Sequence, residues 1–407
     1  MVLNIFFVLD FTFIFICVII YTQGGTSMNN LKILKIKVSG YKLLEDGFTL
    51  NLLNRSRVYD EDKNDEIIEV LENLYIPTVT VFTGRNSSGK STVLSLMRFI
   101  RELLNSGRIK YNPMDFRNND ISVELHFLLD DNIYKYVGLI SKPPMNTLNE
   151  TNYCMIYNEK ISSKKYYKSK SKNIFDSNFL DEDKYKSNVA DTSILYTLTK
   201  DKLFMFKADN SNIISTLSMI LHIYNLLKID EKIILLIANL FDENIEEIKY
   251  NNETKLFDVT LKGLGKKLYN EDDMEILLSD GTKKGLTLFA LSIGVLEKGG
   301  TLVIDEIENS FHKNLVENII MMFNDKRINK NKANLMFSTH YVEILDIFRR
   351  RDNIFIMKKN DYITVCNLYE DYDTRVELSK SNQFNNNTFN TLINYEKLME
   401  LKKELIK

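Results

Sequence analysis

The chain has 407 residues and 44% of them are hydrophobic, a composition that is typical of globular proteins and excludes a largely disordered chain. Its 53 lysines and arginines nearly balance 55 aspartates and glutamates, which excludes attraction to nucleic acid through the net charge of the whole molecule. The odd number of cysteines, with no CxxC spacing, argues against a disulfide framework or a zinc site and favours a cytoplasmic protein; they are Cys17, Cys154 and Cys366.

The first apolar stretch, residues 2–21, is about long enough to cross a bilayer. Asp10 lies in its middle and no Lys or Arg precedes it, so it fits neither a signal peptide nor a membrane anchor well. Met28 opens a second segment with the pattern of a soluble strand. We therefore predict that Met28 is the true start and that residues 1–27 are translated upstream sequence; a genuine anchor and a buried apolar extension are the alternatives. We expect no membrane partner.

An N-terminal lobe is predicted at residues 28–145, from alternating apolar residues, turn residues and one helically spaced apolar run. In chain order the predicted elements are two strands within 31–53, a surface loop at Asp60–Asp65, a strand at 77–83, a helix at 93–104 and a hairpin over 121–140.

A polar, partly helical insertion is predicted at residues 146–255. It contains a tract from Glu159 to Asn173 with six lysines and two adjacent tyrosines, which makes nucleic acid a candidate partner. A solvated loop is the alternative, because no base-reading motif accompanies the charge. An apolar run at 213–240 has helical spacing. A β/α pattern then returns in a C-terminal lobe at 256–370, and 371–407 are predicted to form a tail.

A phosphate-binding loop is predicted between the strand at 77–83 and the helix that follows it. The pattern GxxxxGK[ST] is met by Gly84, Gly89, Lys90 and Ser91. Backbone N–H groups of such a loop point inward and cradle phosphates, and the helix adds its positive end. Lys90 is expected to neutralise the β- and γ-phosphates of ATP, and Ser91 to place its hydroxyl on Mg²⁺. The predicted nucleotide-binding residues here are Gly84, Arg85, Asn86, Ser87, Ser88, Gly89, Lys90, Ser91 and Thr92.

An acidic pair follows the short apolar strand at 301–304. Carboxyl ends of parallel strands face the ligand, so Asp305 is expected to reach Mg²⁺ and Glu306 to polarise the attacking water. A further β-rich run at 333–339 ends in His340, which we expect to lie beside the γ-phosphate and to help orient that water. The predicted catalytic residues are Glu306, His340 and Lys90, and the predicted metal ligands are Ser91 and Asp305.

The sequence Leu278-Ser-Asp-Gly-Thr282 opens an apolar helical run and resembles the LSGGQ signature of ABC ATPases. Ser279 and Gly281 at a helix amino terminus are suited to a γ-phosphate. Because this helix cannot fold back onto its own phosphate loop, a second copy of the chain is expected to supply the nucleotide. A plain turn with an N-cap is the alternative reading of the same residues.

These motifs resemble those of RecF, SMC and OLD-type ATPases, and more closely those of stand-alone AAA/ABC-type ATPases of bacterial abortive-infection and phage-defence loci. The likeness lies in GxNxSGKS at 84–91, SDGTKKGLTLFAL from Ser279, LVIDEIENSFH from Leu302 and FSTHYVEIL from Phe337. It implies an α/β fold, a P-loop NTPase of the ABC-ATPase head type with a mixed sheet and a helical insertion between the phosphate loop and the signature. It also implies an ATP-dependent dimer or larger homo-oligomer that controls an effector.

Three features depart from the family pattern. Asp280 stands where the signature has its first glycine, and no glutamine occurs between the phosphate loop and the signature to hold Mg²⁺; Asp115 and Asn119 are the candidate replacements. The tail after His340 is short for the Toprim nuclease domain of OLD proteins. We therefore expect the effector, a nuclease or a toxin, to be a separate chain.

Four functions follow from these observations. The leading hypothesis is a cytoplasmic ATPase whose ATP-bound dimer gates a partner in phage defence. A RecF-like repair ATPase that DNA stimulates, the nucleotide-binding subunit of a transporter, and a nucleotide switch with negligible hydrolysis are the alternatives. Turnover stimulated by DNA would favour the repair ATPase, and a polytopic membrane partner would favour the transporter subunit. Single-turnover kinetics would separate a nucleotide switch from an ATPase.

Overall fold

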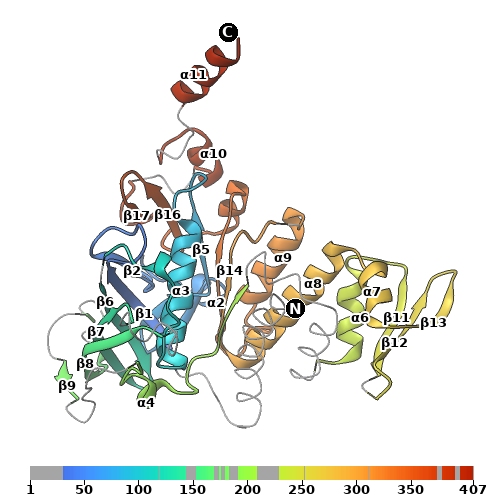
Figure 1. Cartoon of the computed structure of the whole chain (residues 1–407), viewed down its shortest axis with the longest axis horizontal. Coiled ribbons are helices and arrows are strands. Elements are labelled where there is room, and N and C mark those ends of the chain that lie inside the picture. Colours follow the sequence, from blue (N-terminus) through green and yellow to red (C-terminus); the bar gives the residue numbers. More distant parts are fainter. Residues whose placement is uncertain are drawn as a thin grey trace.

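The computed structural model describes residues 31–118, 120–143, 153–168, 174–175, 179–182, 191–208, 229–251, 253–309, 311–373, 378–389 and 395–406. An antiparallel sheet lies at one end of the molecule and a small three-stranded sheet at the other, with a mixed sheet and the long helices between them (Figure 1). None of the described helices is both long and apolar enough to span a bilayer.

The antiparallel sheet belongs to the N-terminal part of the chain. Its strands, in spatial order, are β2 (Phe48–Asn51), β1 (Lys32–Ser39), β6 (Asp120–Leu129), β7 (Asn132–Ser141), β8 (Met155–Lys165) and β9 (Leu180–Asp181). Leu129 pairs with Asn132 across a tight turn in which Asp130 has a φ of 52°, so the predicted hairpin is confirmed. A second hairpin, β3 (Ile67–Leu71) and β4 (Leu74–Pro77), packs on this sheet.

The mixed sheet carries the phosphate loop. Its spatial order is β10 (Met205–Ala208), β14 (Thr301–Ile304), β15 (Asn334–Ser338), β5 (Val79–Thr83), β16 (Ile354–Lys359) and β17 (Ile363–Asn367). All neighbours are parallel except β16 and β17. The carboxyl ends of β5, β14 and β15 therefore meet at one edge, as the sequence predicts.

Helix α3 (Lys90–Asn105) lies between the two large sheets. Its apolar residues recur with helical spacing and are buried against both β1 and β6 on one side and the mixed sheet on the other. Helices α8 (Asp280–Lys298) and α9 (Lys313–Asn324) cover the opposite face of the mixed sheet. The result is a layered α/β core in which α3, α8 and α9 each pack their apolar residues against a sheet.

The segment predicted as an insertion contributes to three sheets. β8 pairs with β7, β10 joins the edge of the mixed sheet, and β11 (Ile245–Asn251) pairs with β12 (Leu256–Leu261), which also pairs with β13 (Gly265–Tyr269). Helix α6 (Glu231–Asn239) falls within the predicted helical run, whereas residues 213–228 lie outside the described residues. The small sheet, α6 and α7 (Glu271–Leu277) form the far end of the molecule in Figure 1.

The charged stretch predicted as a surface loop does lie at the surface, where Asp60, Glu61, Lys63 and Asn64 are exposed, but it forms a short helix, α2 (Asp60–Asn64). Asp62 is buried because its carboxylate accepts a 2.7 Å hydrogen bond from Arg350, which also pairs with Asp352. The prediction of a loop was wrong because hydrophilic composition alone does not reveal a buried ion pair. The remaining short elements are η1 (Pro113–Asp115), α4 (Tyr196–Thr199), η4 (Val342–Ile347), α10 (Lys380–Asn385) and α11 (Tyr395–Ile406).

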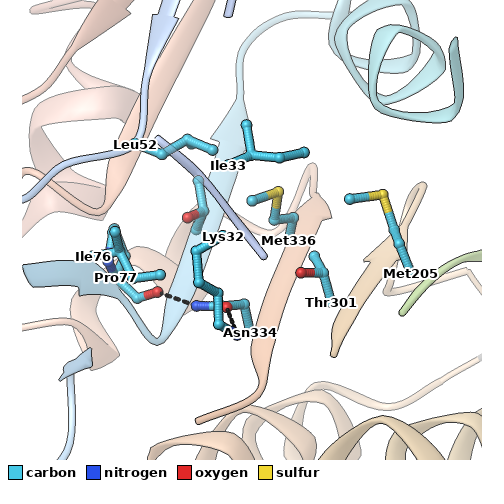
Figure 2. A pocket seen from close by; sticks show the side chains of 10 residues that line it. Lys32, Ile33, Leu52, Ile76, Pro77, Met205, Thr301, Asn334 and Met336 are labelled. Atoms are coloured by element: carbon cyan, nitrogen blue, oxygen red, sulfur yellow. Dashed lines mark hydrogen bonds between the residues drawn. The ribbon is translucent and has the colours of Figure 1, made fainter. Parts of the chain in front are cut away.

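A buried lysine ties the antiparallel sheet to the amino ends of the mixed sheet (Figure 2). The Lys32 Nζ donates to the carbonyl oxygens of Gly299 (2.9 Å) and Lys332 (2.7 Å) and to Oδ1 of Asn334 (3.1 Å). Asn334 in turn donates to the carbonyl of Pro77. Burial, with a smaller effect of the charge of Lys332, lowers the pKa of Lys32 to about 7. All three donors of the ammonium are therefore satisfied inside the protein.

Candidate nucleotide-binding site

The phosphate loop follows β5 and ends where α3 begins at Lys90, which confirms the predicted strand, loop and helix. Gly84 and Gly89 have φ values of 149° and 104°, which L side chains rarely adopt. A Cβ on Gly84 would lie 2.5 Å from the carbonyl oxygen of Met357, and one on Gly89 would lie 2.5 Å from the side chain of Ile363. Both glycines are thus required by conformation and by the close approach of β16 and β17.

A cleft of about 810 Å³ opens in front of this loop. One wall is the loop itself, and the acidic edge of the sheet contributes Glu306 and His340. Neither residue is near the loop in sequence, so the parallel strand order brings them there. The lining residues are Asn86 to Thr92, Glu306 and His340, with Lys42, Leu43, Pro113, Met114, Phe116, Arg117, Lys359 and Ile363 on the other walls.

Lys90 is buried at the base of the cleft. Its Nζ donates to the carbonyl oxygens of Gly84 (2.9 Å) and Arg85 (3.2 Å) and lies 3.4 Å from Nδ1 of His340. Burial lowers the pKa of Lys90, and nearby carboxylates oppose this effect. The ammonium donates to neutral carbonyl oxygens. A phosphate oxygen would take their place and form a stronger, charge-assisted hydrogen bond.

The two predicted acids follow β14 directly. The hydroxyl of Ser338, at the end of β15, donates to Oδ1 of Asp305 (2.6 Å) and accepts from the backbone N–H of Glu306 (2.7 Å). Glu306 has a φ of 51°, an uncommon conformation for a residue with a side chain. Ser338 therefore fixes both residues, and it was missed in the sequence. The available signal was a hydroxyl that directly follows three apolar residues at the end of a buried strand.

His340 lies between Lys90 and Glu306. Its Nε2 is 3.5 Å from Oε1 of Glu306, while Nδ1 faces Lys90. The backbone N–H of His340 donates to the carboxylate of Glu308. In contrast, His126 lies in the antiparallel sheet beside Glu124, where burial lowers its pKa to about 4. The structure thus brings Lys90, Glu306 and His340 together at the cleft.

The predicted signature lies elsewhere in the chain's own structure. Ser279 caps α8 by accepting from the N–H of Thr282 (3.1 Å), and neither Ser279 nor Gly281 lines the cleft. The Asp280 carboxylate is exposed and pairs with Lys283 at 3.1 Å, so part of its charge is compensated. Whether these residues act on the nucleotide of a second copy stays a prediction.

Asp115, a candidate for the missing glutamine, does not line the cleft. Its buried carboxylate lies 3.4 Å from the Lys42 ammonium and 3.7 Å from Arg98. Its neighbours in η1, Pro113 and Met114, do line the cleft, so Asp115 supports that wall from behind. The other candidate, Asn119, lies outside the described residues.

Magnesium in nucleotide sites is held by few protein atoms, with water and phosphate oxygens completing its shell. The described residues contain no group of three or more His, Cys, Asp or Glu side chains that could form a dedicated metal cage. Ser91 lines the cleft with an exposed side chain, whereas Asp305 does not line it and has one of its two carboxylate oxygens engaged by Ser338. These donors fit a magnesium ion that arrives with a nucleotide.

Comparisons with solved structures find distant similarities. Similar solved structures are the SMC head domain from Thermotoga maritima (12% identity, TM-score 0.38, 83% of this chain and 98% of that one) and an SMC head bound to the winged-helix domain of ScpA (14%, 0.43, 83% and 97%). Another is the recombination mediator RecF (11%, 0.41, 84% and 100%). No curated protein sequence matches the chain.

The phosphate loop between β5 and α3, the acidic end of β14 and the mixed sheet make this an α/β P-loop NTPase fold. A family model described as "AAA domain, putative AbiEii toxin, Type IV TA system" matches residues 79–346, which is more than half of the chain and contains the phosphate loop, both acids and His340. The chain belongs to this AAA family of P-loop ATPase domains.

Proposed function

We propose that the protein binds and hydrolyses ATP, and that Mg²⁺ is its cofactor. The observation that carries this proposal is the convergence of Lys90, His340 and Glu306 at the mouth of a phosphate loop. Loop N–H groups and the start of α3 would cradle the phosphates, and Lys90 would exchange its carbonyl partners for phosphate oxygens. Ser91 and Asp305 would hold Mg²⁺, which supplies charge neutralisation when it is bound.

Hydrolysis needs a base beside the γ-phosphate. Glu306 is half-exposed at the cleft, and Ser338 fixes its backbone. We propose that Glu306 accepts a proton from the water that attacks the γ-phosphorus, while the bond to the ADP oxygen breaks. His340 would donate to a phosphate oxygen and keep the Glu306 carboxylate oriented through the 3.5 Å contact.

We further propose that the active form is a dimer or a larger homo-oligomer. Ser279 and Gly281 lie at the amino terminus of a helix of 19 residues but do not reach their own chain's cleft. A second copy would place them on the γ-phosphate, because helix N-termini favour anions. The assembly would then persist only until hydrolysis, because the γ-phosphate joins the two copies.

The family description, which mentions a putative AbiEii toxin, motivates a role in anti-phage defence. We propose that the ATP-bound assembly gates a separate effector in the cytoplasm. Nucleic acid is a proposed trigger. Of the described lysines in the tract from Glu159, Lys160 pairs with Asp181 at 2.7 Å and Lys168 pairs with Glu72, so their charges are partly compensated.

The substitution Glu306→Gln tests the proposal. It removes the base but keeps the shape, so we expect ATP turnover to fall at least about a hundredfold while ATP still binds and the assembly persists. Phosphate release and light scattering with ATP measure these two effects. Lys90→Ala is the matched variant, and it should lose ATP binding. Wild-type turnover in Glu306→Gln would show that Glu306 is not the base.

A further inference from the structure

A third acid near the site, Glu308, has a role that the motif assignment does not include. The N–H of His340 lies beyond the end of β15 and donates to Oε1 of Glu308. Glu308 belongs to the loop after β14, whose Ile307 N–H also donates to the carbonyl of Ser338 (3.1 Å). The backbone that carries the His340 imidazole is therefore held by the loop that carries the acids.

The other oxygen of the same carboxylate, Oε2, is buried and has no hydrogen-bond partner among the described residues. Such an atom is costly unless a nearby charge compensates it. The cation of this cluster is Lys90, because His340, whose backbone N–H binds Glu308, also places its Nδ1 3.4 Å from the Lys90 Nζ. Glu308 thus acts on Lys90 through charge and on His340 through a hydrogen bond.

We infer that Glu308 is a positioning residue for hydrolysis, which holds His340 between Lys90 and Glu306 and restrains Lys90 electrostatically. This inference rests on the proposed ATPase function. It adds that the site contains a carboxylate whose charge opposes the incoming phosphates. Glu308 therefore weakens ATP binding and supports turnover. Its removal is expected to tighten ATP binding and to lower kcat.

Two substitutions separate these effects. Glu308→Gln removes the charge but keeps an oxygen that can accept from the His340 N–H, whereas Glu308→Ala removes both. We expect both variants to bind Mg-ATP about threefold to tenfold more tightly, because a like charge has been removed from the phosphate site. We expect kcat to stay within about threefold of the wild type for Glu308→Gln. For Glu308→Ala we expect kcat to fall more than about tenfold, because the N–H of His340 has lost its acceptor and His340 is no longer held in place.

The measurements are the Kd of a fluorescent ATP analogue with Mg²⁺ and steady-state kcat on the full chain, with thermal unfolding as a check of folding. Glu343→Gln is the matched control, since it removes one carboxylate that is exposed in η4. Unchanged affinity in both Glu308 variants, or weaker binding together with lower kcat, would overturn the inference. Failure of the ATPase proposal is seen separately, as wild-type turnover in Glu306→Gln.

Discussion

At the scale of single residues, the site depends on hydrogen bonds that the motifs do not contain. Ser338 joins Asp305 to the backbone of Glu306, and its side chain is fully buried. One hydroxyl thus acts as donor to a carboxylate and acceptor from an N–H, which leaves neither group unsatisfied. The conformation of both acids is set by a residue on the neighbouring strand.

The substitution Ser338→Ala is expected to release this arrangement. The N–H of Glu306 would lose its acceptor, and a residue already at positive φ would become free to move. We expect kcat to fall about tenfold, which corresponds to ~1.4 kcal/mol in the activation barrier, with a smaller change in ATP affinity. Steady-state kinetics and ATP binding check this. Equal losses in both would instead indicate general damage to the fold.

At the scale of elements, the parallel strands explain why the sequence predicted so much of the site. Apolar runs that end in Gly84, Asp305 and His340 mark the carboxyl ends of β5, β14 and β15, and these ends share one edge. The roles of Ser338 and Glu308 could not be predicted in the same way. They depend on which strands are neighbours and on side-chain direction across a turn, and neither is encoded in local periodicity.

Helix α8 offers a paired prediction, because two of its glycines have different surroundings. A Cβ on Gly285 would collide with the ring of Phe241, whereas one on Gly281 would meet only Ser279 Oγ at 3.7 Å. Gly285→Ala should therefore destabilise the fold by about 1–3 kcal/mol. Gly281→Ala should leave stability unchanged or slightly higher, and should weaken the ATP-dependent assembly of Glu306→Gln. Thermal unfolding and light scattering test this pair; an intact assembly in Gly281→Ala would contradict a phosphate-binding signature.

At the scale of the whole molecule, the two large sheets are joined by the buried Lys32. Its pKa of about 7 lies below the ordinary 10.5, so the unfolded chain binds more protons than the folded one between these values. The contribution of Lys32 to stability is therefore lowest below pH 7 and rises as pH increases from 7 to 10.5. We expect this pH effect to be independent of nucleotide. Lys32 contacts residues at the amino ends of β14 and β15, whereas the acids follow the carboxyl end of β14.

The substitution Lys32→Met isolates this effect. We expect the free energy of unfolding of the wild type to rise with pH relative to that of the variant, by up to about 1.4 kcal/mol per pH unit between pH 7.5 and 9.5. Urea denaturation at several pH values measures the difference. The contributions of other titrating groups are the same in both proteins and cancel in this difference. Lys326, whose pKa is lowered to about 8 by burial, is one of these groups. Parallel pH profiles would show that Lys32 does not titrate in this range.

The phosphate loop is supported from outside the family-matched segment. Ile363 covers Gly89, and the carbonyl of Lys359 accepts from the Arg85 side chain at 2.7 Å. Leu43, from the first strand-to-strand loop, accepts from the N–H of Ile363 and so steadies that support. A fragment limited to residues 79–346 would keep every residue of the sequence motifs. It would lose both segments that support the phosphate loop, the one with Leu43 and the one with Lys359 and Ile363. We therefore expect the smallest part of the chain that binds ATP on its own to extend in both directions beyond residues 79–346.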